Sequence, residues 1–188
     1  MKNNAPLIGF VASAGVMLLA FAVYFIFLAK KNEYLVDNPT NKTFYFKINN
    51  GEENIITSGQ FVKVDLNKGE KNSIKVFDDQ KKLLFDSAFN VTQYRGLLNI
   101  TNSDYYIHRQ FYGYVPNKDS LLMSSNFEID GEKFPGFVIH RKKLFIEDFY
   151  YNLDEDYDQV IKNIDKLESR TKIYRKQDFL DFYKENYK

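Results

Sequence analysis

An uncharged segment near the amino terminus constrains this chain more than any other feature. Residues 7–29 carry no charged side chain, and Lys30 and Lys31 follow at once. An α-helix rises about 1.5 Å per residue, so roughly 20 apolar residues cross a hydrocarbon core about 30 Å thick. The segment therefore predicts a single transmembrane helix over residues 7–29, preceded by a short tail at residues 1–6.

A cleavable signal peptide is the alternative interpretation of this segment. The sequence Ala20-Phe21-Ala22 resembles the small-residue site at which such peptides are cut. The apolar run continues beyond that site to Leu28, whereas a cleavage site is normally followed by polar chain. We therefore favour an uncleaved anchor. The chain contains no cysteine, which excludes a lipid anchor on an N-terminal cysteine.

The charges that flank the segment bear on its orientation. Lys2 lies on one side, and Lys30 and Lys31 lie on the other. Taken alone, the positive-inside rule favours a cytoplasmic C-terminal domain. Short N-terminal tails of bacterial single-pass anchors usually stay in the cytoplasm, which favours the opposite arrangement. We expect a single-pass protein of the inner membrane whose C-terminal domain is exported to the periplasmic or extracellular side.

The rest of the chain is formally neutral and rich in aromatic residues. All 25 acidic residues lie beyond the segment, and so do all basic residues except Lys2. Non-specific nucleic-acid binding requires a basic surface, so neutrality argues against a nucleic-acid partner. About 150 residues with 18 Phe and 14 Tyr in the whole chain are enough for one domain with a sizeable core.

Residues 41–101 predict a small β-sandwich. Phe44, Phe46 and Ile48 alternate with polar or half-buried positions, as expected of a strand with one buried face. Asn49-Asn50-Gly51 follows, and this sequence favours a type I′ hairpin turn because Asn and Gly tolerate positive φ. Similar alternation recurs at about ten-residue spacing up to residue 91. The arrangement is similar, at the level of fold alone, to the β-sandwich modules of bacterial envelope proteins.

The remaining segments complete a chain that is mainly β after its N-terminal helix. We expect a polar linker at residues 30–40 and β-hairpins at residues 102–153, one of them turning at Asp130-Gly131. Residues 154–188 predict one or two C-terminal α-helices, because apolar residues recur there at helical spacing. These apolar positions are Val160, Ile161, Ile164 and Leu167 in the first stretch, and Phe179, Leu180, Phe182, Tyr183 and Tyr187 in the second.

The only two histidines lie in a repeated Ile-His-Arg sequence, at His108 and His140. A pair of histidines is able to bind a metal or to transfer protons. No third ligand and no helical zinc-binding motif accompanies them, so they fall short of a recognisable zinc site. We therefore expect both to lie on strand faces beside aromatic residues.

An acidic cluster offers a second site for a metal ion. Asp154, Asp156, Asp158 and Asp165 match positions 1, 3, 5 and 12 of a calcium-binding loop. Gln159 occupies the position where such a loop needs glycine for its sharp turn. We therefore interpret the cluster as the acidic first turn of a helix that begins at about Asp156.

No nucleophile elbow, glycine-rich phosphate loop or cysteine is present, so we predict no catalytic, cofactor-binding or metal-binding residue and no cofactor. The second half is dense in aromatic residues, which favour protein interfaces. The same rings are also able to pack the contact between the sheet and the terminal helices, and both alternatives stay open. Our candidates for binding a partner are Tyr105, Tyr106, Phe111, Tyr112, Tyr114, Phe179, Phe182, Tyr183 and Tyr187.

Two functional hypotheses follow. The first is a non-enzymatic, single-pass protein that contacts the bilayer through residues 7–29. Its β-rich domain binds other membrane or envelope proteins, as an accessory or assembly subunit of a bacterial envelope complex. The alternative is a membrane-tethered hydrolase or metal-dependent enzyme that uses His108 and His140.

Overall fold

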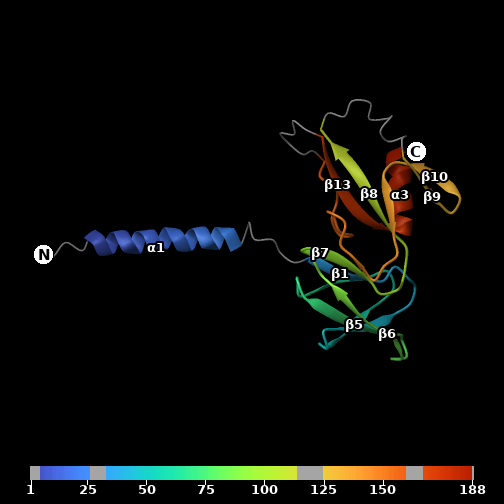
Figure 1. Ribbon diagram of the computed structural model, residues 1–188, viewed down its shortest axis with the longest axis horizontal. Coiled ribbons are helices and arrows are strands. Elements are labelled where there is room, and N and C mark those ends of the chain that lie inside the picture. Colours follow the sequence, from blue (N-terminus) through green and yellow to red (C-terminus); the bar gives the residue numbers. More distant parts are fainter. Residues whose placement is uncertain (1–4, 26–32, 114–124, 160–166, 188) are drawn as a thin grey trace. The chain divides into compact units, whose positions relative to one another are not determined.

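The computed structural model describes residues 5–25, 33–113, 125–159 and 167–187. The chain divides into two compact units, Met1–Asn32 and Glu33–Lys188, which are considered separately. The first contains one helix and the second is mainly β (Figure 1).

Helix α1 (Ala5–Val23) contains no charged residue. Its large side chains are exposed, with 71% of the Phe10 surface and 70% of the Leu18 surface accessible. Ser13 satisfies its hydroxyl by donating a hydrogen bond of 2.9 Å to the Phe10 carbonyl. Among the described residues, no helix combines the length and the apolar character that crossing a membrane requires. The transmembrane span predicted over residues 7–29 is therefore not confirmed and stays a prediction.

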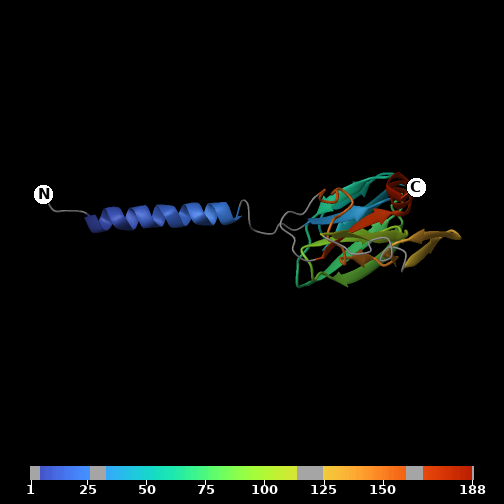
Figure 2. The same ribbon diagram turned by 90° about the horizontal axis from the view of Figure 1, so that it is seen from above.

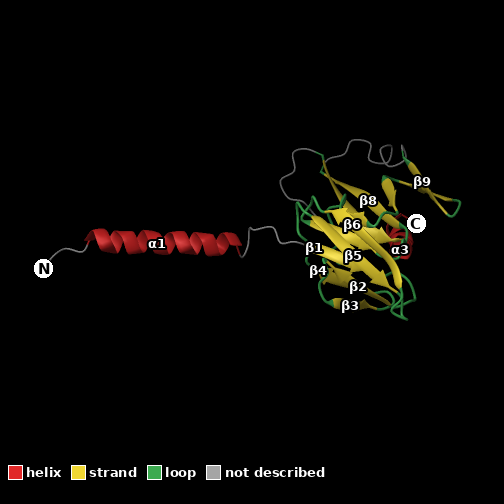
Figure 3. Ribbon diagram, turned by 60° about the horizontal axis from the view of Figure 1, so that its bottom comes forward, coloured by secondary structure: helices red, strands yellow, loops and turns green. Residues whose placement is uncertain are grey.

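The second unit contains thirteen described strands and one described helix (Figures 1 and 3). In chain order they are β1 (Glu33–Asp37), β2 (Phe44–Ile48), β3 (Glu53–Ile56), β4 (Phe61–Val64), β5 (Lys71–Phe77), β6 (Leu83–Asn90), β7 (Arg95–Asn99), β8 (Tyr105–Tyr112), β9 (Asn126–Ile129), β10 (Glu132–Pro135), β11 (Val138–Arg141), β12 (Phe145–Ile146), β13 (Glu168–Arg175) and α3 (Lys176–Tyr187).

These strands form three larger sheets and one separate hairpin. Sheet A has the order β12-β7-β1-β4, sheet B the order β3-β2-β5-β6, and sheet C the order β11-β8-β13. Strand β1 runs parallel to β7 and antiparallel to β4, whereas sheets B and C are antiparallel throughout. Strands β9 and β10 form the hairpin, which extends from the side of the domain (Figure 2).

Sheets A and B share one hydrophobic core. Val36 and Leu98 of sheet A pack with Phe46, Ile74 and Val76 of sheet B, and all five are fully buried. Two sheets with a common core between their faces are compatible with the predicted β-sandwich. The alternation predicted for β2 and β5 is observed in their burial: β5 buries every second side chain, and β2 buries Phe44 and Phe46 while Ile48 is half-buried.

The opposite face of sheet A packs against sheet C. Leu35 of β1 and Leu97 of β7 lie in a second core with Ile107 of β8 and Ile173 of β13. Sheet A is therefore covered on both faces, which explains why β1 is buried along nearly its whole length.

Helix α3 covers the outer face of sheet C. Phe179 and Tyr183 are buried in a third core, together with Tyr106 of β8, Tyr174 of β13 and Phe134 of the β9–β10 hairpin. The prediction of a C-terminal helix is confirmed, with Asp178 in its first turn and Lys184 in its last, as the helix dipole favours.

Both hairpin turns expected from the sequence adopt positive φ angles. The φ angles are 48° at Asn49 and 56° at Asn50, and they are 54° at Asp130 and 83° at Gly131. These values are those that a type I′ turn requires at its two central residues.

Two segments differ from their prediction. The predicted linker at residues 30–40 contains β1, because its short apolar run is buried on both faces and therefore lacks the alternation of a half-buried strand. The segment 154–188 contains strand β13 before α3, and residues 155–158 are not helical. Val160, Ile161, Ile164 and Asp165 lie outside the described residues.

Candidate functional site

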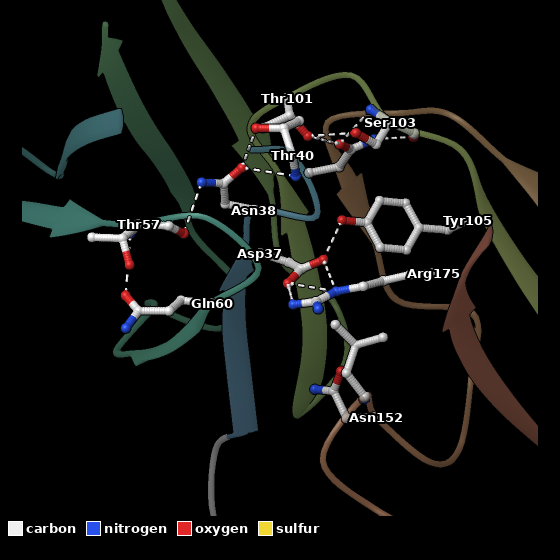
Figure 4. Close-up of polar contacts among 12 residues, drawn as sticks. Asp37, Asn38, Thr40, Thr57, Gln60, Thr101, Ser103, Tyr105, Asn152 and Arg175 are labelled. Carbon is white, nitrogen blue, oxygen red and sulfur yellow. Dashed lines mark hydrogen bonds and ion pairs between the residues drawn. The ribbon is translucent and has the colours of Figure 1, made fainter. Parts of the chain in front are cut away.

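A buried polar cluster joins sheets A and C. Asp37, the last residue of β1, is completely buried and accepts hydrogen bonds from Arg175 Nε at 3.0 and 3.2 Å. A second guanidinium nitrogen of Arg175 contacts the same carboxylate, and the Tyr105 hydroxyl donates to it at 2.5 Å (Figure 4). Tyr105 and Arg175 are register partners on β8 and β13, so the pairing places both beside Asp37.

The loops around this cluster are held by amide side chains. Asn38 Nδ2 donates to the carbonyls of Lys42 at 2.7 Å and Thr57 at 2.9 Å, while its Oδ1 accepts from the Thr40 hydroxyl at 2.7 Å. Asn38 is fully buried, so these bonds satisfy a group that would be costly to leave unpaired. The end of β1 is therefore held by two sets of contacts. Asp37 pairs with Arg175, and Asn38 bonds to the backbone of the neighbouring loops.

The protonation states in this cluster favour a structural role. Burial beside Asp37 raises the pKa of the Tyr105 hydroxyl far above its ordinary value. Burial by itself lowers the pKa of Arg175, but the hydrogen bonds and charge of Asp37 outweigh this effect and the pKa is raised. Tyr105 therefore stays protonated and Arg175 stays charged near neutral pH, as their hydrogen bonds to Asp37 require.

An open cavity of about 420 Å³ lies next to this cluster, at the start of α3. Ser103, Asp104, Lys176 and Asp178 line it together with Pro39, Gln177 and the edge of Arg175. Both signs of charge occur in this lining, so it selects neither a cation nor an anion by charge alone.

His108 lies in an aromatic enclosure beneath α3. Only 2% of its surface is exposed, and the rings of Tyr157, Phe182 and Tyr187 lie within 6.1 Å of it. The Tyr157 hydroxyl donates to the His108 carbonyl at 2.7 Å, so the 2.9 Å contact with Nδ1 requires the imidazole to donate. Burial lowers the pKa of His108 to about 4, so the ring is neutral at pH 7.

His140 occupies a different environment from His108. Its side chain is 43% exposed, and its Nε2 contacts Asp104 at 2.7 Å. The two histidines lie on the neighbouring strands β8 and β11 and have separate hydrogen-bond partners. Within the ranges that the structure describes, no group of three or more His, Asp or Glu side chains is arranged to hold a metal ion.

The acidic residues of the calcium-loop comparison also have separate partners. Asp154 pairs with Lys63 at 3.0 Å, Asp156 with Lys172 at 3.1 Å, and Asp158 accepts from the Tyr151 hydroxyl at 2.6 Å. The expected acidic first turn of a helix from about Asp156 is wrong for residues 155–158, which are not helical and whose acidic side chains bond to separate partners.

Most aromatic candidates for partner binding lie inside the domain. Tyr187 is 42% exposed, Phe111 and Phe182 are half-buried, and Tyr114 lies outside the described residues. The other five are buried: Tyr105, Tyr106, Tyr112, Phe179 and Tyr183. The aromatic density therefore serves mainly the packing of α3 and sheet A on sheet C, which is the alternative left open by the sequence.

Exposed apolar residues at one edge of sheet B lie outside the sites predicted from the sequence. Leu83 and Leu84 expose 49% and 48% of their surface at the start of β6. The sequence contains a sign of this exposure, because two adjacent leucines begin an alternating strand. Successive side chains of a strand point to opposite faces, so both leucines cannot face the core.

Comparisons of this chain with protein-family models, with curated proteins and with solved structures find no match.

Proposed function

We propose that this chain is a single-pass, membrane-anchored protein whose β-rich domain binds another protein without catalysing a reaction. It would serve as an accessory or assembly subunit of a bacterial envelope complex, with its domain on the exported side. The observation that carries the anchor is the uncharged run at residues 7–29, together with the exposure of large apolar side chains such as Phe10 and Leu18 of α1. An uncharged helix with such side chains exposed requires an apolar environment, which a bilayer supplies.

The uncharged run supports the anchor further, since it extends in the sequence from Leu7 to Ala29, beyond the end of α1 at Val23. Lys30 and Lys31 follow it, as expected where an anchor meets the lipid headgroups.

The interaction role is supported by how the domain uses its polar groups. Asp37 and His108, the buried groups with the strongest potential for chemistry, are engaged by Arg175 and Tyr157 and hold the layers together. Tyr187 at the end of α3 packs one side of its ring on His108 and Tyr183, and the 42% of its surface that remains exposed offers apolar area to a partner.

Affinity purification from detergent-solubilised membranes tests this role. The wild-type chain should retain a specific envelope protein, and Tyr187→Ser should retain less of it, whereas Glu185→Ser on the same exposed turn should not. Retention of no protein above background by the wild-type chain would overturn the interaction role. A reporter fused after Lys188 tests the side of the membrane, because export and cytoplasmic retention give opposite signals.

A further inference from the structure

Strand β6 forms an uncovered edge of sheet B. Among the described strands it pairs with β5 alone. The edge strands β3, β4, β11 and β12 are shorter, with four residues or fewer. Strand β13 is equally long, but Tyr150 and Tyr151 bond to its outer side through the backbone of Thr171. Strand β6 is thus the longest edge strand that the described residues leave unpaired on its outer side.

The backbone of β6 presents hydrogen-bonding groups outward at alternate residues. Asn49 N donates to Ser73 O, so the backbone of Ser73 faces β2 and not β6. Its register partner Ala88 therefore belongs to a non-hydrogen-bonded pair, and so does Asp86 opposite Lys75. The N–H and C=O groups of Asp86 and Ala88 point away from β5.

The side chains of β6 do little to protect this edge. Natural edge strands are usually blocked by charges, proline or bulges. Asp86 is the only charged residue of β6, and Lys75 on the neighbouring strand pairs with it at 3.6 Å. The register shift of β6 lies before Phe85, so the stretch from Phe85 to Asn90 is regular.

The core side of the same edge is incompletely covered. Phe85 and Phe89 pack against the shared core of sheets A and B, yet both are only half-buried. The Phe89 ring lies 5.0 Å from that of Phe145. Apolar surface at an open edge would be covered by a strand that continues the sheet.

We infer that β6 pairs with β6 of a second copy of this chain, antiparallel, about a two-fold axis at Ser87. In this register Asp86 of each copy exchanges both backbone bonds with Ala88 of the other. Phe85 of each copy lies opposite Phe89 of the other, where aromatic pairs stabilise a sheet. Sheet B becomes one continuous sheet across the two copies.

Charge disfavours the neighbouring register that has its axis at Asp86. An axis at Asp86 would place two carboxylates directly opposite each other, which is destabilising. With the axis at Ser87, each Asp86 faces the small side chain of Ala88 and keeps its own Lys75. A two-fold interface must be self-complementary, and this stretch meets that condition. The inference stands without the membrane anchor and without the partner protein proposed above.

Two substitutions of opposite charge at Ala88 test the pairing. Ala88 is exposed, so neither Ala88→Asp nor Ala88→Lys should disturb the folded chain, which circular dichroism verifies. In the dimer, residue 88 faces Asp86 of the second copy. Ala88→Asp should weaken self-association about tenfold, because two like-charged pairs form, and Ala88→Lys should bind at least as tightly as wild type.

The measurement is analytical ultracentrifugation of the full chain in detergent over a range of protein concentrations. A wild-type chain that stays monomeric throughout would overturn the inference. Equal dimerisation of the two variants would do so as well, since it places the contact elsewhere.

A disulfide tests the register independently. Ser87 meets its own copy in a non-hydrogen-bonded pair, where Cα atoms lie about 4.5 Å apart and a disulfide fits. Because the chain has no cysteine, Ser87→Cys provides a single thiol. Under mild oxidation it should crosslink at least tenfold faster than Asp65→Cys, an exposed control beyond the end of β4. Equal crosslinking rates would contradict the two-fold axis at Ser87.

Discussion

Asp37 and Arg175 form a buried ion pair between residues 138 positions apart in the chain. Asp37 ends β1, an inner strand of sheet A, and Arg175 ends β13 in sheet C. The pair therefore connects sheet A, which shares a core with sheet B, to sheet C, which is covered by α3. The hydroxyl of Tyr105 donates a further hydrogen bond to the same carboxylate.

Replacing Asp37 by Asn should destabilise the domain strongly. The substitution keeps the shape of the side chain but leaves the Arg175 charge without its counter-ion in a largely buried position. Breaking a buried ion pair from one side costs about 3 kcal/mol or more. Urea unfolding followed by circular dichroism measures the loss.

The exposed pair of Lys184 and Asp181 provides the control for this experiment. Lys184→Ala should change the free energy of unfolding by less than about 0.5 kcal/mol, because exposed ion pairs contribute little. A similar cost for the two substitutions would contradict the structural role of the buried pair.

His108 should make the stability of the domain depend on pH. Burial lowers its pKa from an ordinary 6.5 to about 4. Between these pH values the unfolded chain binds a proton at His108 that the folded chain does not. The free energy of unfolding should therefore fall as the pH drops from 6.5 towards 4, by about 3 kcal/mol in all.

His108→Phe removes this titration and keeps an aromatic ring among Tyr157, Phe182 and Tyr187. Carboxylates also titrate at the lower end of the window, so the informative quantity is the difference between wild type and variant at each pH. An identical pH dependence in both proteins would show that His108 is accessible to protons in the folded state.

Phe179→Ala should remove most of the contact between α3 and sheet C. The ring is completely buried and contacts the rings of Tyr106, Tyr174 and Tyr183. A buried Phe→Ala substitution costs about 3–5 kcal/mol. Thermal unfolding measures it against Ile55→Ala, whose side chain is half exposed and should lose less than about 1 kcal/mol. Equal losses would mean that α3 adds little to the core.

Gly96→Ala should destabilise the packing of β7 in sheet A. A Cβ atom at this position would lie 2.4 Å from the ring of Phe145, which is closer than carbon atoms approach. Overpacking of this kind costs about 1–3 kcal/mol. In the double variant with Phe145→Leu, the shorter side chain should relieve the clash. Strictly additive unfolding free energies would exclude this contact as the cause.

The strands with one buried face were predictable because alternation records that burial directly. Phe44, Phe46 and Ile48 of β2 show it, and so do Ile74 and Val76 of β5. The turns were predictable from residues that tolerate positive φ. Strand β1 was not predicted. Because it is buried on both faces, it shows a short apolar run in place of alternation, and this run was assigned to the linker that follows the predicted anchor.

The polar junction was beyond sequence reasoning for a different reason. Nothing local marks Asp37, Tyr105 and Arg175 as partners, since their proximity depends on the stacking of sheet C on sheet A. Five of the nine aromatic candidates for partner binding are buried, because composition does not tell a packed ring from an exposed one. Phe179 and Tyr187 lie on the same helix and differ in this respect.

Alkaline carbonate extraction of membranes from cells that express the full chain tests the central claim most directly. The account predicts that the wild-type protein stays in the membrane pellet. A variant with Leu18→Arg and Leu19→Arg in α1 should move to the supernatant, because a charge at the centre of a bilayer is costly. Release of the wild-type protein by carbonate would contradict anchoring by residues 7–29.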